Sequence, residues 1–520
     1  MRQVRKKILG AAALIFWLGA GAGNAQTQAD FFDDSVVHEV RLEIRPSDWE
    51  RLKANFQENT YYPCNFEWRG LQVEDIAIRS RGRGSRSGTK PNLRVDFNRY
   101  EETRQFLGLK AFHLKANNED ASFLKERLTM LFFRRMGIPA SREAHARLYV
   151  NGQYVGLYLV VEELNKEFLK RNFDENEGYL YEWKPPEDPY HFEYLGSDPS
   201  RYSPLPFDPK THETDPEPRP LEAMIRTINQ ASNADFPRAA AEYLDLKLFV
   251  THVAIENFLS EADGILGDIL GMNNFYLYRF KGKNLSQLIP WDKDHTFAAS
   301  DREIFKNANA NVLMRRALAI PEVRSAYLEA LAKSAVLAGG PDGWLSQEIA
   351  REYDQIRTAA REDPFKMYQA ADGFLKPSSE EVFFNEASRV SQFAGERTAE
   401  VLRQVAAAGF RPSAEAPSVN AGGVVNLANG AVGVLTLGSV VSLYGERLSN
   451  TTAEAATQPS PTTLGGVSVY IDGFAAPLLF VSPTQINVKV PREIRPGSVS
   501  LSVIANGTLG NTLTVNALLP

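Results

Sequence analysis

Two patterns of apolar and polar positions follow one another along most of the chain. Residues 37–44 and 91–97 alternate between apolar and polar side chains, as half-buried strands do. Residues 145–164 hold two such runs around Asn151-Gly152, a strong short signal for a β-hairpin. Apolar residues in 122–137 and 242–263 recur instead at helical spacing. Strands therefore dominate the first part and helices the second, which predicts an α+β domain with two lobes.

The pattern changes after Pro412. Val, Gly, Ser, Thr and Asn become frequent, charged residues become sparse, and short alternating runs are bounded by Gly, Asn and Pro. This pattern predicts an all-β, immunoglobulin-like sandwich of about seven strands. We therefore expect a larger domain over residues 30–410 and a sandwich domain over 412–520, joined by a short linker at 411–418.

The first residues predict an export signal over 1–25. A basic start at residues 2–7 precedes an uncharged apolar run at 8–23. Gly23-Asn24-Ala25 then supplies small residues at the spacing that a signal peptidase accepts. A retained membrane anchor is the alternative, although the run is short for a spanning helix. We expect a secreted, periplasmic or cell-surface protein with no transmembrane segment after signal cleavage.

Composition excludes several classes of protein. The chain has 520 residues, of which 43% are hydrophobic and 23% charged, so it is neither disordered nor a polytopic membrane protein. Its 58 basic and 64 acidic residues give a net charge of −6, which offers no general attraction to nucleic acid. Cys64 is the single cysteine, so neither an intramolecular disulfide nor a cysteine metal cluster is possible.

Asp292 and Asp294 form the most informative acidic pair. Two residues apart in an extended segment, both carboxylates point to one face. Hard anionic ligands at this spacing suit Mg²⁺ or Mn²⁺, and a cation between them would offset their repulsion. A pair of turn carboxylates that only caps a strand end is the alternative.

Five segments, taken in order, resemble the CotH family. They are residues 78–97, 148–173, 177–184, 273–280 and 288–297. The resemblance implies a two-lobed, atypical protein-kinase-like fold that uses ATP and Mg²⁺ (or Mn²⁺). The implied reaction moves the γ-phosphoryl group of ATP to Ser or Thr of a secreted or surface protein. The tail resembles a β-sandwich domain found at the C-terminus of secreted bacterial proteins.

The resemblance assigns roles to four polar residues. Asp292 takes the place of the metal-binding kinase aspartate, and Asp294 assists it. Asp263 ends a predicted helix and would accept the proton of the attacking hydroxyl group. Asn274 would complete the metal shell with a neutral oxygen. Two rivals stay open, Asp268 for the base and Asn273 for the ligand.

A segment rich in arginine and glycine, residues 79–88, resembles the loop that covers the phosphates in kinases. Its small residues would let backbone N–H groups approach a phosphate, and its guanidinium groups would bind phosphate in bidentate fashion. Arg81 and Ser85 are the candidates for contact with the nucleotide. A basic, solvated hairpin tip is the alternative.

Further candidates for nucleotide binding follow from the same resemblance. Lys90 and Arg94 are both candidates for the cation that grips the α- and β-phosphates, and Glu126 on the next helix could pair with that cation. Glu162 is expected near the adenine or ribose. A first-turn helix acid is the alternative for Glu162.

Two functions from different classes remain open from the sequence, and nucleotidyl transfer to a protein is a third chemistry that the sequence does not separate from the first. The first is an exported kinase. The second is a non-catalytic envelope, coat or adhesion protein built on a degenerate kinase-like fold. The sandwich tail would suit a binding role in such a protein. A converged set of carboxylates would favour the enzyme.

Overall fold

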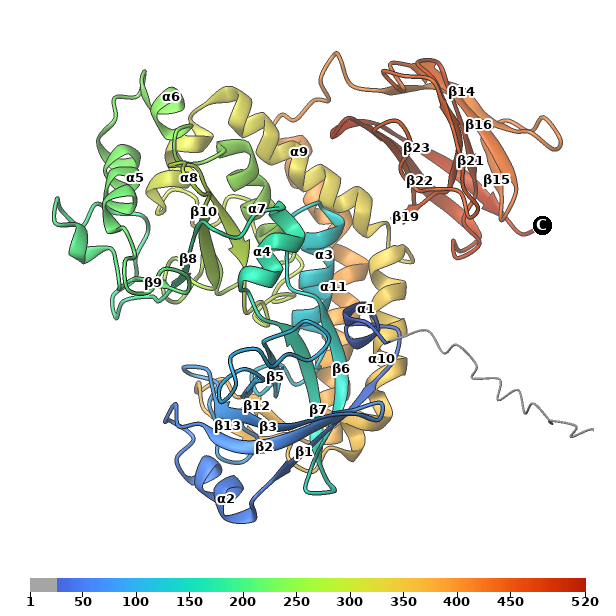
Figure 1. Ribbon diagram of the computed structural model, residues 1–520. Helices are drawn as coiled ribbons and strands as arrows, with labels where there is room; N and C mark the ends of the chain where they lie inside the picture. Colours follow the sequence, from blue (N-terminus) through green and yellow to red (C-terminus); the bar gives the residue numbers. More distant parts are fainter. Residues whose placement is uncertain (1–25) are drawn as a thin grey trace, which may run out of the picture.

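The computed structural model describes residues 26–520, which form two lobes followed by a β-sandwich (Figure 1). The predicted export signal therefore lies outside the described residues. Within 26–520, no helix is long and apolar enough to cross a membrane.

The first lobe is a closed barrel with the strand order β1-β2-β3-β4-β5-β7-β6. β1 and β6 pair in parallel and close it, and the hairpin predicted at Asn151-Gly152 joins β6 to β7. Alternate strand positions fill the interior with apolar side chains such as Phe66, Trp68 and Phe112. The strands are β1 (His38–Ile44), β2 (Tyr62–Trp68), β3 (Leu71–Ser80), β4 (Leu93–Asp96), β5 (Ala111–Lys115), β6 (Glu143–Val150) and β7 (Gln153–Glu162). The helices are α1 (Gln28–Phe31), α2 (Pro46–Ala54) and α3 (Lys125–Arg135).

The second lobe packs helices around a four-stranded sheet with the order β11-β10-β8-β9. Its central helix, α7 (Leu246–Phe258), is buried on nearly every side, so the expectation of an amphipathic helix is corrected. The strands are β8 (Tyr179–Trp183), β9 (Phe207–Pro209), β10 (Phe275–Arg279) and β11 (Ser286–Pro290). The other helices are α4 (Lys166–Phe173), α5 (Pro218–Gln230), α6 (Phe236–Ala240), α8 (Val312–Leu318) and α9 (Pro321–Ala338).

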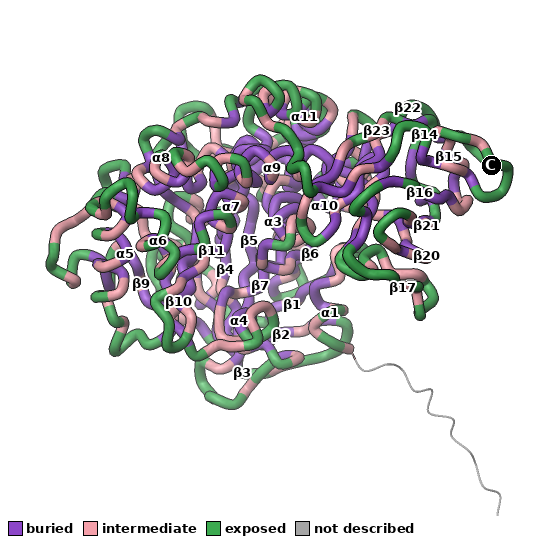
Figure 2. The backbone as a smooth tube through the Cα atoms, turned by 90° about the horizontal axis from the view of Figure 1, so that it is seen from above, coloured by how far each residue is buried: buried purple, intermediate pink, exposed green. Residues whose placement is uncertain are grey.

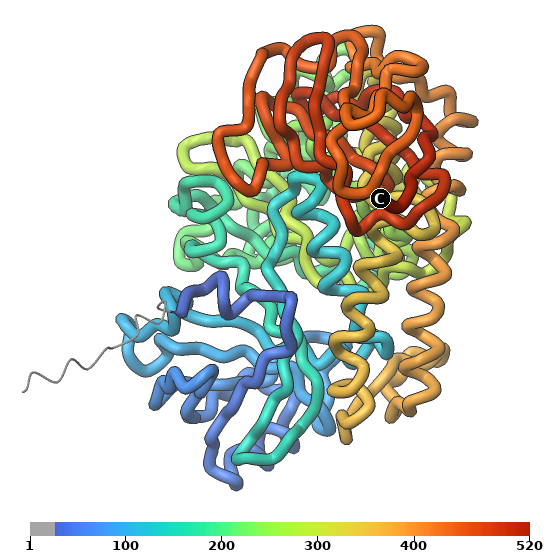
Figure 3. The backbone as a smooth tube through the Cα atoms, turned by 90° about the vertical axis from the view of Figure 1, so that its right-hand side faces the viewer, coloured from blue at the N-terminus to red at the C-terminus, as the bar shows by residue number. Residues whose placement is uncertain are grey.

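Two long helices, α10 (Trp344–Glu362) and α11 (Glu380–Ala407), run along both lobes (Figure 3). The small hairpin of β12 (Met367–Gln369) and β13 (Leu375–Pro377) connects them. The far end of α10 reaches the barrel, where the Tyr154 hydroxyl donates to the carbonyl oxygen of Ala359 at 2.8 Å. These helices therefore hold the two lobes together from one side.

The C-terminal domain consists of two five-stranded sheets around a separate apolar core (Figure 2). The sequence predicted about seven strands, and the difference lies in strands of two or three residues, which leave no alternating pattern. The expected linker falls between the end of α11 and the start of β14. The strands are β14 (Ser418–Asn426), β15 (Val434–Thr436), β16 (Val440–Glu446), β17 (Ala453–Glu454), β18 (Val467–Ile471), β19 (Phe474–Ala475), β20 (Leu478–Val481), β21 (Gln485–Lys489), β22 (Gly497–Ala505) and β23 (Thr508–Leu518).

Candidate active site between the lobes

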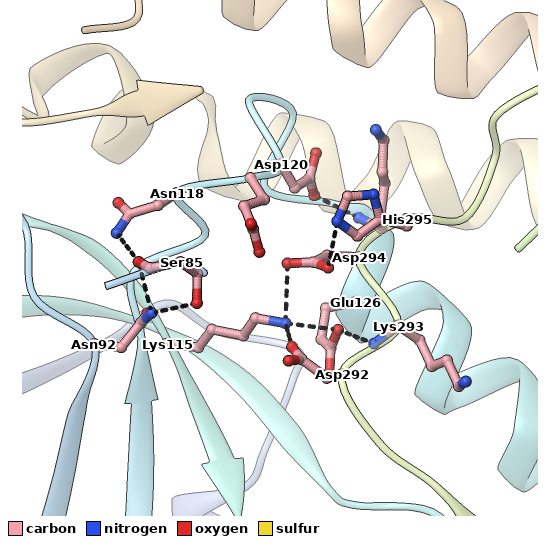
Figure 4. Close-up of polar contacts among 12 residues, drawn as sticks. Ser85, Asn92, Lys115, Asn118, Asp120, Glu126, Asp292, Lys293, Asp294 and His295 are labelled. Carbon is pink, nitrogen blue, oxygen red and sulfur yellow. Dashed lines mark hydrogen bonds and ion pairs between the residues drawn. The ribbon is translucent and has the colours of Figure 1, made fainter. Parts of the chain in front are cut away.

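Three carboxylates converge on one buried ammonium group, that of Lys115 (Figure 4). Its Nζ lies 2.9 Å from Glu126 Oε2 and 3.1 Å from Asp294 Oδ2, and it also pairs with Asp292. Burial opposes the charge, but the three carboxylates hold the pKa of Lys115 well above its usual value. The side chain is therefore a permanent cation at the centre of the site.

Local geometry explains why these groups meet. Lys115 is the last residue of β5, and Glu126 stands in the first turn of α3, which begins ten residues later at Lys125. Asp292 follows β11, and Asn274 precedes the paired strand β10. Both have a positive φ, 54° and 58°, and the N–H of Trp291 donates to Asn274 O at 3.2 Å. Left-handed backbone at non-glycine residues is uncommon and clusters at functional sites.

The structure brings Asp263 and Asn274 into direct contact. Asp263 Oδ2 accepts hydrogen bonds from the side-chain amides of Asn274 at 3.0 Å and of Asn273 at 2.8 Å. Burial raises the pKa of Asp263, and the charge of Asp292 contributes to the shift. Asp263 therefore lies against Asn273 and Asn274 and near enough to Asp292 for their charges to interact. Its rival Asp268 points elsewhere, because its carboxylate pairs with Arg302 at 2.7 Å.

A second group of possible ligands lies on the other side of Asp294. Glu119, Asp294 and His295 offer ligand atoms that all lie within 4.8 Å of one another, as do Glu126, Asp292 and Asp294. Burial and the charges of the acidic pair raise the pKa of Glu119 to about 8. Burial also raises the pKa of Glu126 to about 7, although Lys115 opposes this. The site therefore carries a surplus of carboxylates that a further cation would relieve.

Sequence reasoning missed Lys115 and Glu119, and for His295 it favoured a hydrogen-bonded structural role over metal binding. Glu119 lies in the loop after β5, where no periodic pattern distinguishes a functional acidic residue from an ordinary one. The helical spacing of 122–137 placed Glu126 on a helix, but nothing in the sequence identified Lys115 as its partner. A strand that ends in lysine just before that helix is the signal that could have found it.

Arg81 is the member of the arginine-rich loop that faces the site. Its guanidinium carbon lies 5.3 Å from the centre of the Trp291 ring. Although burial opposes ionisation, Lys115 and then Arg81 hold the pKa of Asp292 at about 2. Arg86 turns away and donates to the backbone oxygens of Phe56 and Glu58, so it ties the loop to the barrel.

Ser85 is fixed at the edge of the site by side-chain amides (Figure 4). Asn92 Nδ2 donates to Ser85 Oγ at 3.1 Å, and Asn118 Nδ2 donates to Ser85 O at 3.0 Å. Arg83 Nη1 reaches across to Pro185 O in the second lobe at 3.1 Å. The loop is therefore anchored to both lobes.

Lys90 lies outside the site, which corrects its expected role. Its side chain is completely buried, and Nζ pairs with Asp363 at 2.7 Å. The carbonyl oxygens of Ala116 and Leu157 complete its hydrogen bonds at 2.9 and 2.8 Å. Lys90 therefore joins the barrel to the end of α10, and Lys115 stands where Lys90 was expected.

Arg94 and Glu162 are also corrected. Arg94 lies on β4, one strand away from Lys115, and pairs with Glu163 at 2.7 Å rather than with Glu126. The Glu162 carboxylate is buried between Arg142 at 2.6 Å and Arg171 at 2.5 Å. Successive side chains of a strand point to opposite faces, and the neighbouring Glu163 lies beside Arg94 and His113 instead.

A buried ion pair connects the two loops of the site. Lys293 Nζ pairs with Glu256 Oε1 of α7 at 2.6 Å, and the N–H of Lys293 donates to Glu126 Oε2 at 2.5 Å. Glu256 Oε2 also accepts from the N–H of Ile265, two residues after Asp263, at 2.8 Å. One carboxylate therefore holds both the Asp263 loop and the Asp292 loop.

Known proteins resemble this chain in both of its parts. Over residues 431–518 it matches the IPT/TIG domain. Inner spore coat protein H of Bacillus subtilis (strain 168) is 25% identical over 339 residues, which cover 63% of this chain and 88% of that protein. The Helicobacter pylori proinflammatory kinase CtkA aligns over 61% of this chain and 95% of its own, with 9% identity and a TM-score of 0.25. The γ-CGTase of alkalophilic Bacillus clarkii covers 20% of this chain and 12% of its own, with 19% identity and a TM-score of 0.14.

The larger match decides the family. A family model described as CotH kinase protein covers residues 78–401, more than half of the chain. The two-lobed part is therefore a kinase-like domain, and an immunoglobulin-like sandwich follows it. The chain belongs to the CotH kinase protein family.

Proposed function

We propose that this protein is an exported, metal-dependent protein kinase. It would transfer the γ-phosphoryl group of ATP to Ser or Thr of a secreted or surface protein. One observation carries the proposal: Asp263 and Asn274 are hydrogen-bonded to each other beside the cluster of Lys115, Asp292 and Asp294. Carboxylates and a buried cation that converge between two lobes are the parts that phosphoryl transfer requires.

The donor atoms suit a hard divalent cation. Asn274, Asp292 and Asp294 would hold Mg²⁺ or Mn²⁺, since carboxylate and amide oxygens are the ligands that these ions prefer. Asp263 Oδ1 is buried and has no hydrogen-bond partner among residues 26–520. When bound, the ion would offset the negative charge of the phosphate oxygens.

The chain's own groups would bind the phosphates and take up the proton. Lys115 and Arg81 offer the cations on the phosphate side, and Ser85 offers a hydroxyl group at the edge. Asp263 would accept the proton of the attacking hydroxyl group at Oδ1, because the two amides already occupy Oδ2. Its raised pKa makes it a stronger base than an ordinary aspartate.

A non-catalytic envelope or coat protein is the second candidate. Two observations favour it: the curated relative is named as a spore coat protein, and the C-terminal part matches the IPT/TIG domain. In that case the ion pairs around Lys115 would serve only to hold the lobes together.

A transfer assay separates these candidates. The full chain is incubated with γ-labelled ATP, Mn²⁺ or Mg²⁺, and a secreted or envelope protein fraction. Labelled protein is expected with the native chain, and the label is expected to disappear with Asp292→Ala and Asp263→Asn. Asp268→Asn is the matched control, because that carboxylate pairs with Arg302 away from the site. Label from α-labelled ATP would indicate nucleotidyl transfer, and no label from either nucleotide would favour the coat protein.

A further inference from the structure

The C-terminal sandwich is packed against the second lobe at the corner where α3, α9 and α10 meet. The turn between β18 and β19 inserts there, and Asp472 O accepts from the N–H of Trp344, the first residue of α10, at 3.0 Å. The Asp472 carboxylate accepts from the N–H of Gly340 at 2.8 Å. The backbone of the sandwich turn therefore caps the start of α10, and the Asp472 side chain holds the connection between α9 and α10 at Gly340.

The sandwich turn and the second lobe pack so closely that neither glycine at the contact can carry a side chain without a shift of the backbone. A Cβ at Gly339 would lie 2.4 Å from Asp472 O, and a Cβ at Gly473 would lie 2.8 Å from Leu337 O. A second turn, between β22 and β23, places Leu509 in the core of the lobe, and its N–H donates to Glu329 Oε1 of α9 at 2.9 Å. The sandwich is thus part of the same packed body as the second lobe.

Arg135, the last residue of α3, joins that helix to the sandwich. Its Nη2 donates to Gly473 O at 2.7 Å, and its guanidinium carbon lies 3.6 Å from the centre of the Trp344 ring. Burial lowers the pKa of Arg135 to about 10. The structure therefore places a half-buried cation against the sandwich carbonyl and the indole face, which both favour its charge.

The opposite end of the same helix carries Glu126, the partner of Lys115. Between the two ends, Arg127 pairs with Glu348 at 2.5 Å and Glu352 at 2.9 Å, both on α10. The sandwich turn therefore fixes α3 directly through Arg135, and also indirectly through the start of α10. Nine residues of helix, about 14 Å, separate Arg135 from Glu126.

We infer that docking of the sandwich sets the position of α3, and with it the Glu126–Lys115 pair, which makes Arg135 a positioning residue for the candidate active site. This inference rests on the proposed function for its link to metal binding. The claim that the sandwich sets the position of α3 does not depend on that function.

The test uses the full chain with Arg135→Ala and two measurements. Hydrogen exchange at residues 125–130 reports on α3, and electron paramagnetic resonance titration with Mn²⁺ alone reports on the site. Amide exchange in this stretch is expected to become at least about fivefold faster and Mn²⁺ affinity at least about fivefold weaker, the lower end of usual couplings between sites. Arg135→Lys, which can still donate to Gly473 O, is expected to recover most of the affinity.

Arg447→Ala is the matched control, because Arg447 pairs with Glu446 on the sandwich and contacts Ala416 O. It should leave both measurements unchanged. Two results would overturn the inference. One is an Arg135→Ala variant whose α3 amides exchange at the native rate. The other is a variant whose α3 amides exchange faster while its Mn²⁺ affinity stays native. If Arg135→Ala does not fold, Asp342→Arg replaces it, and adding Arg495→Asp should restore both measurements because the reversed pair re-forms.

Failure of the proposed function gives a different result. A native chain that binds no Mn²⁺ would contradict the metal site, while the exchange of α3 would still decide whether the sandwich positions that helix.

Discussion

Two lysines that are equally buried have different roles. Lys90 pairs with one carboxylate, that of Asp363, in a closed space between the barrel and α10. Lys115 faces three carboxylates, that of Glu126 from α3 and those of Asp292 and Asp294 from the loop after β11. Removal of the first leaves one unpaired buried charge, whereas removal of the second leaves a ring of carboxylates that a metal ion can neutralise.

The two variants in which methionine replaces one of these lysines should therefore differ in their response to metal: Mn²⁺ should restore stability to one and not to the other. Lys115→Met is expected to abolish phosphoryl transfer and to lower the free energy of unfolding in metal-free buffer, with the stability recovered by Mn²⁺. Lys90→Met is expected to lose about 3–5 kcal/mol of stability that Mn²⁺ does not restore. Chemical denaturation of both variants with and without Mn²⁺ checks this, and equal recovery of the two would contradict the assigned roles.

At the residue scale, sequence reasoning identified the acidic residues better than the basic ones. Asp263, Asn274 and Asp292 were marked by their positions at the ends of a predicted helix and of a predicted hairpin, and the structure brings them together. Lys115 was not marked, because a lysine at the end of a strand becomes informative only when it is considered together with the helix that follows and its Glu126. Glu162 was expected near the adenine or ribose but pairs with Arg142 and Arg171, because a strand that is buried on both faces shows no alternation from which its direction could be predicted.

At the scale of elements, α7 holds the two loops of the site at a fixed separation. Glu256 pairs with Lys293 on one loop and accepts from Ile265 on the other. Burial opposes ionisation of Glu256, but Lys293 and then His252 hold its pKa at about 2. The folded-state pKa lies below the usual 4.5, so the ionised form stabilises the fold above about pH 4.5, and this contribution is lost as the pH falls toward 2.

Part of the acid sensitivity of the protein should therefore come from the Glu256 carboxylate. Glu256→Gln is expected to lower stability at neutral pH by about 3 kcal/mol and to flatten the decline in stability between about pH 4.5 and 2. Urea denaturation across that range measures both effects. Glu386→Gln on α11 is the control, since that carboxylate pairs with the exposed Arg389 side chain at the surface and should change little. A native pH profile for Glu256→Gln would contradict the role of the pair.

The elements themselves were largely predictable, and the exceptions have physical causes. Asn151-Gly152 fixed the first hairpin, and both residues have a positive φ, as such a turn requires. Apolar spacing gave α3, and Gly137 marked its end with a φ of 81°. The burial of α7 on nearly all sides was not predictable, because it depends on which helices cover it. The two- and three-residue strands of the sandwich depend on pairing across the sheet.

At the scale of the whole molecule, the order of the domains was visible in the composition, but their contact was not. The change after Pro412 separates the charged, helical part from the sandwich. The contact depends on two turns, at Asp472 and Leu509, whose residues look like ordinary hairpin turns in the sequence. Tight packing against Gly339 makes the two domains one body, so a change in the sandwich can reach the site between the lobes.

The central claim is that oxygen donors from distant segments bind a metal–nucleotide complex between the lobes. Thermal unfolding of the full chain with ATP and Mg²⁺ together tests this most directly, with ATP alone and Asp292→Asn as comparisons. The account predicts stabilisation of the native chain by about 2.7 kcal/mol when the complex is present at about 100 times its Kd, and none in either comparison. No stabilisation of the native chain by any nucleotide with any divalent ion, or equal stabilisation of Asp292→Asn, would contradict it.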